Sequence, residues 1–371
     1  MDRRSFINKA GIAGATVTVA GSALAQNIQV SPLRIAVIGL VHAHVHGILN
    51  RKKVGDIEIV AIVESNKALA GRYSKLHNFS MDIVFNTMEE MISKVKPEAV
   101  SSFSTTFDHL SVVEFCAPKG IHVMVEKPLA VNAVHAQKMK ELAQKHNIQL
   151  LTNYETSWYS THQKAWQYII EEKKAGDLRK IVFHTGHQGP FEIGTNPEFT
   201  DWLTDPVLNG GGALTDFGCY GANLATWLMK GEKPLTVSCI TQHIKPEIYP
   251  KVEDEATILI TYPKSQVIIQ ASWNWPFNRK DMEIYGQHGY LICEDRNNLN
   301  HRWKETKTAV KETIPENNAP YNDPFSFMTA VIRKTITPHP FDLSSLENNL
   351  IVMDILDAAR ESVKTGKTIN L

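Results

Sequence analysis

RIAVIGLVHAHVHG, residues 34–47, joins an apolar β-run to a glycine turn and then to three histidines. A strand, a glycine turn and a helix form the opening of a dinucleotide-binding βαβ unit. The glycine fingerprint of that unit falls on Gly39, Val41 and His44, so only its first glycine is present. The tight turn is therefore expected, although Val41 and His44 keep the backbone further from a pyrophosphate than glycines would.

Strand-like and helical segments alternate after this opening. We expect strands at 33–39, 57–63, 99–103 and 122–125, and helices at 67–77, 88–94, 109–119 and 132–146. This alternation predicts an α/β fold that begins with a Rossmann domain, a doubly wound parallel sheet, which we assign to residues 30–150. Such a sheet binds ligands at the carboxyl ends of its strands.

The second expected strand ends in a carboxylate. Glu64 lies 25 positions after Gly39, near the spacing at which an acidic residue accepts hydrogen bonds from the adenosine ribose. A carboxylate at this place would repel the 2′-phosphate of NADP. The sequence therefore predicts NAD as the cofactor.

Three histidines, His42, His44 and His46, alternate in the opening stretch. On a strand they would share one face and could ligate a metal, whereas in a loop that enters a helix they diverge. No nearby Asp, Glu or Cys in the sequence completes a ligand shell, so we predict no metal site. The histidines can instead cap the helix, contact the cofactor or face solvent.

Length and charge limit the partners. A chain of 371 residues exceeds the usual size of a single core and predicts two domains. Lys+Arg and Asp+Glu both total 39, so no net charge favours a nucleic acid or an acidic membrane surface. The four cysteines have no metal-ligand spacing and are expected to be buried thiols. The expected partner is a small molecule.

The N-terminus has the features of an export signal. DRRSFINK, residues 2–9, carries a twin-arginine pair, and the weakly apolar run 10–24 leads to a small-residue cleavage site after Ala25. The run is shorter than the ~20 apolar residues that a spanning helix needs, so we expect no stable membrane anchor. Residues 1–25 are therefore predicted to be a signal peptide, and the mature protein to be periplasmic.

Three later stretches carry a family resemblance. They are AVSSFSTTFDH at 99–109, IHVMVEKPLA at 121–130 and NGGGALTDFGCYG at 209–221. In this order and spacing they resemble the glucose-fructose oxidoreductase, inositol dehydrogenase and MocA family, over about residues 33–371. The resemblance implies an NAD-dependent oxidoreductase that forms a homo-oligomer, as relatives commonly do.

The sequence pattern changes in the second half of the chain. Strand-like runs follow at 180–185, 235–241, 256–262, 267–275 and 282–285. They predict a mostly antiparallel sheet with one or two helices, which agrees with the second domain of the family. We assign this α+β domain to residues 151–371 and, by resemblance, give it substrate binding and oligomerisation.

The resemblance also implies roles for particular residues. Lys127, in the tripeptide Glu-Lys-Pro, and Tyr220 would exchange the proton of a substrate hydroxyl, and Asp216 would orient hydroxyls. Asp216 and Tyr220 are four apart and would share a helix face, and partial desolvation would lower the pKa of Lys127. Tyr220 can instead be a core tyrosine, and Lys127 a solvated charge. The expected cofactor contacts are Gly39, Val41, His44, Glu64, Ser104, Thr105, His109, Glu126 and Lys127.

Departures from the family pattern bear on the substrate. Many relatives carry an arginine soon after the strand at 149–152, where this chain reads Asn153-Tyr154-Glu155-Thr156. A neutral polyol is therefore favoured over a sugar phosphate or a carboxylate. Aromatic residues that can stack on a pyranose, or simply fill the core, are Trp158, Tyr159, His162, His187, Trp202, Trp273 and Trp275.

The leading hypothesis is an exported oxidoreductase that transfers a hydride between NAD and a secondary alcohol of a sugar or glycoside. Because the periplasm holds no useful pool of free nicotinamide cofactor, NAD would be bound tightly and recycled on the enzyme. One alternative is an NAD-dependent glycoside hydrolase that works by transient oxidation, elimination and re-reduction. Another is an inactive sugar- or nucleotide-binding protein, which the missing glycines favour.

Overall fold

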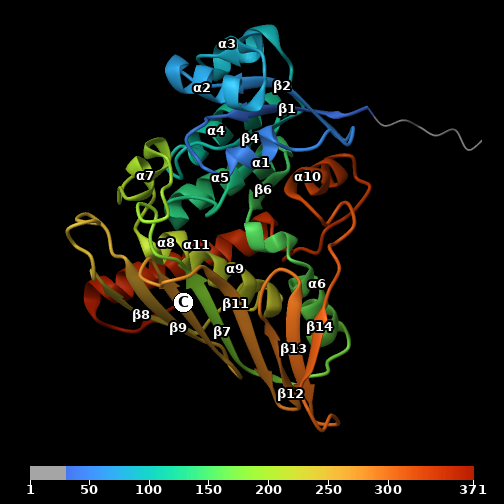
Figure 1. Ribbon diagram of the computed structural model, residues 1–371, viewed down its shortest axis with the longest axis vertical. Coiled ribbons are helices and arrows are strands. Elements are labelled where there is room, and N and C mark those ends of the chain that lie inside the picture. Colours follow the sequence, from blue (N-terminus) through green and yellow to red (C-terminus); the bar gives the residue numbers. More distant parts are fainter. Residues whose placement is uncertain (1–30) are drawn as a thin grey trace, which may run out of the picture. The chain divides into compact units, whose positions relative to one another are not determined.

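Six parallel strands form the first sheet of the computed structural model, which describes residues 31–371 (Figure 1). The predicted signal peptide lies outside the described residues. The strand order is β3-β2-β1-β4-β5-β6. The bounds are β1 Leu33–Ile38, β2 Ile57–Val63, β3 Val84–Phe85, β4 Ala99–Ser102, β5 His122–Glu126 and β6 Leu150–Asn153. The predicted doubly wound parallel sheet is confirmed.

The strand order reverses beside β1, which pairs with both β2 and β4. Within β1 only Arg34 is exposed, because helices cover both faces of the sheet. Coverage on both faces explains why the strands read as continuous apolar runs in the sequence. The point of reversal is where an open α/β sheet binds its ligand, beyond the carboxyl ends of the strands.

Helices alternate with these strands, as the sequence predicts. Their bounds are α1 Val45–Leu49, α2 Lys67–His77, α3 Met88–Lys94, α4 His109–Cys116 and α5 Ala133–His146. Asn66 begins α2 by accepting hydrogen bonds from the backbone N–H groups of Ala68 and Leu69, at 3.1 and 3.0 Å. The first helix, α1, has only five residues.

Nine strands form the second sheet, in the order β14-β13-β12-β11-β7-β10-β9-β8-β15. The bounds are β7 Leu178–Gly186, β8 Thr236–Gln242, β9 Glu255–Thr261, β10 Gln266–Ser272, β11 Arg279–Gly286, β12 Gly289–Cys293, β13 Asn298–Trp303, β14 Val310–Thr313 and β15 Ile369–Asn370. Neighbouring strands are antiparallel except β7 and β10, which are parallel. The predicted large, mostly antiparallel sheet is confirmed.

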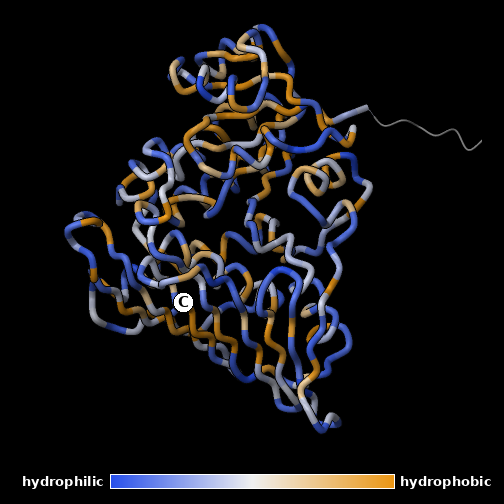
Figure 2. The backbone as a smooth tube through the Cα atoms, in the orientation of Figure 1, coloured by the Kyte–Doolittle hydropathy of each residue, from blue (hydrophilic) through white to orange (hydrophobic). Residues whose placement is uncertain are grey.

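Helices cover one face of the second sheet and connect it to the first. Further helices are α6 Ser160–Trp166, α7 Pro197–Leu203, α8 Ala213–Asp216, α9 Gly218–Leu228, α10 Pro324–Ile332 and α11 Leu346–Thr365. Helix α9 packs on β7 and β10, and α11 packs on α9 and β8 as well as on α5 and β6. Hydrophobic residues recur along the strands of both sheets (Figure 2).

The two sheets belong to one compact unit, Pro32–Leu371. Strand β6 crosses the division at 150/151 that we drew from the sequence, because Leu150–Asn153 completes the first sheet. More helices accompany the second sheet than the one or two expected. Among the described residues, no helix combines the length and the apolar character needed to cross a membrane.

Candidate active site

Lys127 and Asp216 form a buried ion pair beyond the carboxyl end of β5. The Lys127 Nζ binds Asp216 Oδ1 and also donates to the backbone carbonyl oxygen of Asp216, at 3.1 Å. Each residue is only 5% exposed, so the charges are shielded from solvent. The fold therefore brings together two of the residues that the resemblance placed in the site, 89 positions apart in the chain.

The helix expected to carry both Asp216 and Tyr220 is interrupted between them, so this part of the prediction is wrong. Helix α8 ends at Asp216, and α9 begins two residues later. The Asp216 carbonyl accepts from Lys127 Nζ and from Cys219 Sγ (3.3 Å). The backbone N–H of Tyr220 donates instead to the Phe217 carbonyl, at 3.2 Å. The break thus leaves one carbonyl free to hold Lys127.

The ion pair fixes the charge of both partners. Burial alone would lower the pKa of Lys127, but the Asp216 carboxylate outweighs it and the pKa is raised above its usual 10.5. Burial would raise the pKa of Asp216, yet the Lys127 ammonium holds it below 3.8. The lowered pKa that desolvation predicted for Lys127 is therefore wrong, because the counter-charge lies in direct contact. At neutral pH Lys127 is a proton donor.

Tyr220 lies beside the ion pair and is 1% exposed. Its ring centroid is 5.2 Å from Lys127 Nζ and 4.9 Å from Lys280 Nζ. The ring of Tyr154 meets it edge-on, with 5.5 Å between centroids. Burial, assisted by the Glu155 carboxylate, raises the pKa of Tyr220 well above 10. Tyr220 is therefore a neutral phenol flanked by two ammonium groups.

A second ion pair, Lys280 with Glu155, borders Tyr220, and the sequence did not predict it. Lys280 belongs to β11, and Glu155 follows β6. Burial would raise the pKa of Glu155, but Lys280 lowers it to about 2. The hydroxyl of Tyr159 donates to Glu155 Oε1 at 2.9 Å. The loop after β6 is thereby fixed to the second sheet beside Tyr220.

Glu126 is the centre of a hydrogen-bonded chain along the edge of the first sheet. His44 Nδ1 lies 2.8 Å from Glu126 Oε2, and Asn153 Nδ2 donates to Glu126 Oε1 at 2.7 Å. Trp158 Nε1 in turn donates to Asn153 Oδ1 at 2.9 Å. The chain joins the loop after β1 to the ends of β5 and β6.

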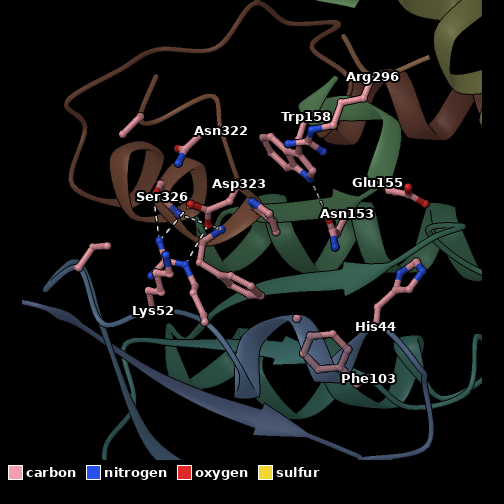
Figure 3. A pocket seen from close by; sticks show the side chains of 16 residues that line it. His44, Lys52, Phe103, Asn153, Glu155, Trp158, Arg296, Asn322, Asp323 and Ser326 are labelled. Carbon is pink, nitrogen blue, oxygen red and sulfur yellow. Dashed lines mark hydrogen bonds and ion pairs between the residues drawn. The ribbon is translucent and has the colours of Figure 1, made fainter. Parts of the chain in front are cut away.

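A cavity of about 730 Å³ opens beside the hydrogen-bonded residues around Glu126 (Figure 3). His44, Asn153 and Glu155 lie along one side, and Asp323 and Ser326 lie on the opposite side. The residues that line it do not include the Lys127–Asp216 pair or Tyr220. The cavity therefore adjoins the catalytic candidates through His44 and Glu155 but is not the space between them.

The opening turn fits a dinucleotide site. Gly39 has φ of +79°, and a Cβ there would lie 3.0 Å from the Phe103 carbonyl oxygen and 3.0 Å from the Ser104 nitrogen. A glycine is required for this close approach of β1 to the end of β4. Gly39 and Ser104, both expected to contact the cofactor, therefore lie side by side at the point where the strand order reverses.

Glu64, at the end of β2, can serve a ribose. Its Oε2 accepts from the Leu40 N–H at 3.1 Å, and its Oε1 accepts from the Asn66 N–H at 2.8 Å. A carboxylate has about four acceptor positions, so these bonds leave capacity for ribose hydroxyls. The residues present thus fit NAD, and the contact of Glu64 with the ribose stays a prediction.

The segment that replaces the second and third fingerprint glycines is held by its own contacts. His44 precedes α1, but its side chain makes no capping hydrogen bond. The Val41 carbonyl accepts from Trp202 Nε1 of α7 at 3.3 Å. After β4, Thr105 Oγ1 donates to Asp108 Oδ2 at 2.7 Å. The cofactor contacts assigned to Val41, His44 and Thr105 stay predictions.

His42, His44 and Glu126 have possible ligand atoms within 4.8 Å of one another. The expectation that no carboxylate joins the histidines is therefore wrong, because the sheet places the end of β5 beside the loop after β1. Internal hydrogen bonds use these groups: the His44 N–H donates to His42 Nδ1 at 3.1 Å, and His44 Nδ1 contacts Glu126. His46 diverges, as a loop predicts, and its Nδ1 lies 2.8 Å from His77 Nε2.

Two aromatic residues near the ion pair carried only a weak signal in the sequence. Trp273 Nε1 donates to Asp216 Oδ2 at 3.0 Å. Burial lowers the pKa of His187, and this effect is opposed by the nearby Asp216 carboxylate. Both residues were among the possible stacking platforms, but nothing distinguished them from core residues. Lys280 gave no signal, since a single lysine in a strand usually faces solvent.

Comparisons with known protein families match both halves of the chain. The model of the oxidoreductase family with an NAD-binding Rossmann fold matches residues 33–154, and the GFO/IDH/MocA C-terminal domain matches residues 163–292. Together the two matches span well over half of the chain.

Several curated relatives share one enzyme name. Trans-1,2-dihydrobenzene-1,2-diol dehydrogenase of Xenopus laevis is 26% identical over 315 residues, which cover 83% of this chain and 90% of that protein. The Xenopus tropicalis protein of the same name is 27% identical over 49% of this chain and 52% of its own length, and the human one 23% identical over 62% and 64%.

Solved structures share the fold at low identity. Aldose-aldose oxidoreductase from Caulobacter crescentus, complexed with glycerol, has a TM-score of 0.77 and 18% identity, covering 92% of this chain and 100% of that one. An inositol dehydrogenase homolog from Azotobacter vinelandii, complexed with NAD⁺, has a TM-score of 0.77 and 17% identity, covering 92% and 98%. With both family domains matched in order, this chain belongs to the GFO/IDH/MocA family of oxidoreductases and has an NAD-binding Rossmann domain.

Proposed function

We propose that this enzyme transfers a hydride between NAD and a secondary alcohol of a sugar or glycoside. The observation that carries the proposal is the buried group of Lys127, Asp216 and Tyr220 beyond the end of β5, which offers two proton donors and one carboxylate. NAD, when bound to the first domain, supplies the hydride chemistry. The protein's part is to orient the alcohol and to handle its proton.

The protonation states of Lys127 and Tyr220 determine what each group can do in reduction and in oxidation. Lys127 is an ammonium and Tyr220 a neutral phenol, so both can donate to the oxygen of a ketone as it is reduced. In oxidation the alcohol proton is transferred to Lys127 or Tyr220, and the group that accepts it must first have lost its own proton. Asp216 holds the Lys127 side chain in place in both directions of the reaction.

The charges around Tyr220 favour a neutral substrate. Lys127 is neutralised by Asp216, and Lys280 by Glu155, so neither ammonium is left to bind a phosphate or a carboxylate. A trans-dihydrodiol, which the relatives' name specifies, is a cyclic vicinal diol like a sugar ring. The names of the structural neighbours include an aldose and an inositol enzyme. A sugar hydroxyl next to a second hydroxyl is consistent with all three.

Export and retention of the cofactor are part of the proposal. The twin-arginine pair at Arg3 and Arg4 supports transport of the folded protein to the periplasm. In that compartment NAD has to stay bound and be regenerated by a second sugar. The enzyme would then interconvert an alcohol and a ketone in pairs without releasing NADH.

We further propose a homo-oligomer formed through the uncovered face of the second sheet. Ile240 of β8 is 74% exposed and Leu259 of β9 is 38% exposed. The strand register pairs Ser238 with Leu259 and Ile240 with Thr257, which puts all four on the face opposite to α11. Ile240→Glu should reduce the mass measured by light scattering if this face is the interface.

The experiment that tests the function begins with the protein as purified. Heat-denatured protein is examined by mass spectrometry for released NAD. The native enzyme is then incubated with free aldoses, methyl glycosides and an aryl glycoside. A keto-sugar product supports the proposal. Release of the aglycone without net NADH would support the glycosidase alternative, and absence of turnover with every substrate would support a binding protein.

Substitution of Lys127 tests the catalytic group. Lys127→Ala should retain NAD and lower turnover at least about a hundredfold, which is the usual loss when a proton-transfer group is removed. Unchanged turnover would remove Lys127 from the chemistry.

A further inference from the structure

Two buried histidines at the edge of the first sheet have a ring nitrogen without a hydrogen-bond partner in the described part of the chain. His42 and His109 are each 1% exposed, and the atom concerned is Nε2 in both. A buried polar atom without a partner costs about 1–3 kcal/mol. A bound ligand is one way in which such an atom finds its partner.

The hydrogen bonds of His42 define its tautomer. The backbone N–H of His44 donates to His42 Nδ1 at 3.1 Å, and because an N–H group can only donate, Nδ1 carries no hydrogen. Burial, with the charges of His44 and Lys127, lowers the pKa of His42 well below 6.5, so the ring is neutral. The single ring hydrogen is therefore on Nε2. His42 Nε2 is a donor that lacks an acceptor.

His109 has the opposite tautomer. Its Nδ1 lies 3.2 Å from the carbonyl oxygen of Leu129, which can only accept, so Nδ1 carries the hydrogen. Burial lowers the pKa of His109 to about 4, despite the opposing effect of the Leu129 carbonyl and the Glu126 carboxylate. The neutral ring then has a bare Nε2. His109 Nε2 is an acceptor that lacks a donor.

Both rings lie where a dinucleotide binds in this fold. The backbone N–H of His42 donates to the Phe103 carbonyl at the end of β4. A ring nitrogen of His42 lies within 4.8 Å of a Glu126 oxygen at the end of β5. His109 begins α4 after the same β4 and contacts the segment that follows Lys127. The unpaired donor and the unpaired acceptor thus belong to one edge of the sheet, beside Glu126 and Lys127.

We propose that His42 and His109 together bind one group of NAD, with His42 Nε2 donating to it and His109 Nε2 accepting from it. The group must accept one hydrogen bond and donate another. The nicotinamide carboxamide does this with its oxygen and its NH₂, and a ribose hydroxyl does it with one atom. The contact rests on NAD binding and not on the sugar substrate. It also gives the histidine that follows Val41 a role, where the fingerprint lacks its second glycine.

Binding measurements on two variants test the proposal without relying on turnover. His42→Phe retains a ring against Phe199, whose centroid is 5.0 Å away, and His109→Phe removes the acceptor. Loss of a hydrogen bond worth about 1 kcal/mol corresponds to roughly fivefold weaker binding. After any resident cofactor has been removed, each variant should therefore bind NAD⁺ roughly threefold to tenfold more weakly than the wild type in calorimetry. His46→Phe, in the same stretch but packed on Tyr73, is the matched control and should bind NAD⁺ as the wild type does.

A cofactor analogue identifies the group that is bound. In 3-acetylpyridine adenine dinucleotide a methyl replaces the carboxamide NH₂, so the donor to His109 is removed. If the carboxamide is bound, the wild type binds the analogue more weakly and His109→Phe adds no further loss. If a ribose hydroxyl is bound, His109→Phe weakens both dinucleotides equally. Either result supports the paired contact.

Imidazole ¹⁵N spectra of the wild type keep the test independent of variant folding. They should show hydrogen on Nε2 of His42 and on Nδ1 of His109, and both Nε2 signals should shift when NAD⁺ is added. The proposal is overturned if either histidine has the other tautomer. It is also overturned if the folded wild type and both variants bind NAD⁺ equally well, which is the result expected if a water molecule, and not NAD, contacts the two ring nitrogens. A wild type that carries no NAD after purification and also binds no added NAD⁺ overturns this contact and the proposed function together.

Discussion

Trp273 donates its indole N–H to Asp216 Oδ2 over 3.0 Å, while the other carboxylate oxygen of Asp216 binds Lys127. Trp273 is fully buried just beyond β10 and packs 4.8 Å from the ring of Tyr249. Because both oxygens of Asp216 are held, the position of the Lys127 ammonium depends on an indole that need not touch substrate. Trp273 is in this sense a positioning residue.

Trp273→Phe should lower kcat about tenfold to a hundredfold with little change in KM. The substitution keeps an aromatic ring in the core but removes a hydrogen bond to a charged group, worth about 1.5–3 kcal/mol. That bond favours the ionised carboxylate, so its loss raises the pKa of Asp216 and should move the acidic limb of the kcat/KM profile to higher pH. Steady-state kinetics across pH measure both effects.

Trp275→Phe is the control for this substitution. Trp275 lies near His184, with 6.4 Å between ring centroids, and near the Arg279 guanidinium, 5.8 Å from its ring. It has no hydrogen bond to Asp216, so the pH profile should stay as in the wild type. An acidic limb that fails to move in Trp273→Phe would show that Asp216 is positioned by other contacts.

The ion pair between Lys280 and Glu155 should contribute to the free energy of unfolding, because each charge is stabilised by the other. Lys280→Met leaves the Glu155 carboxylate without its partner in a partly buried place. Since Glu155 is part exposed to solvent, we expect a loss of about 1–2 kcal/mol in the free energy of unfolding, less than for a fully buried pair. Urea denaturation measures it. In the double variant Lys280→Met/Glu155→Gln most of the loss should be recovered, and a simple sum of the two single losses would argue against coupling.

Buried neutral histidines make the protein sensitive to acid. Burial lowers the pKa values of His109 and His162 to about 4, below the 6.5 of an unfolded chain. Between these values the unfolded state binds more protons, so the free energy of unfolding falls as pH decreases from 6.5 toward 4. At pH 5 each histidine should account for a loss of about 2 kcal/mol relative to pH 7.

His162→Phe isolates one of these contributions. A phenyl ring keeps the packing on Tyr159 but cannot be protonated. Urea midpoints at pH 7 and pH 5 should therefore differ less in this variant than in the wild type. Equal differences in the two proteins would mean that His162 is already protonated in the folded state at pH 5.

Local sequence patterns predict the first sheet well, and long-range contacts explain what they miss. The apolar run at 57–63 and the helical pattern at 67–77 match β2 and α2 at both ends. Strand β13, NLNHRW, was missed because polar residues hide its alternation. The break between α8 and α9 accompanies a hydrogen bond from Lys127, which is 89 positions from Asp216. No local pattern reports such a partner.

In the candidate site, too, the sequence identifies residues, whereas long-range contacts determine their charge states. The resemblance identified Lys127, Asp216 and Tyr220, and the fold brings them together. Their charge states could not be predicted, because the pKa of Lys127 depends on whether burial or the Asp216 carboxylate prevails. The pairing of Lys280 with Glu155 could not be predicted for a related reason, since each resembles an ordinary surface charge until the strands are assembled.

Gly39→Ala should damage the cofactor site more than any other single methyl in the opening stretch. Gly39 has φ of +79°, a conformation that costs an alanine about 1–2 kcal/mol, and the new Cβ would lie 3.0 Å from the Phe103 carbonyl oxygen. The end of β1 would have to move away from Ser104. We expect a loss of about 2–3 kcal/mol in the free energy of unfolding and at least tenfold weaker NAD⁺ binding.

Gly47→Ala is the matched control, because Gly47 lies in α1 and a Cβ there meets no atom within 4 Å. Alanine is a better helix former than glycine, so this variant should gain up to about 1 kcal/mol and bind NAD⁺ as the wild type does. Urea denaturation and calorimetry on both proteins give the comparison. Unimpaired NAD⁺ binding in a folded Gly39→Ala protein would mean that the turn after β1 is not where the dinucleotide approaches the sheet.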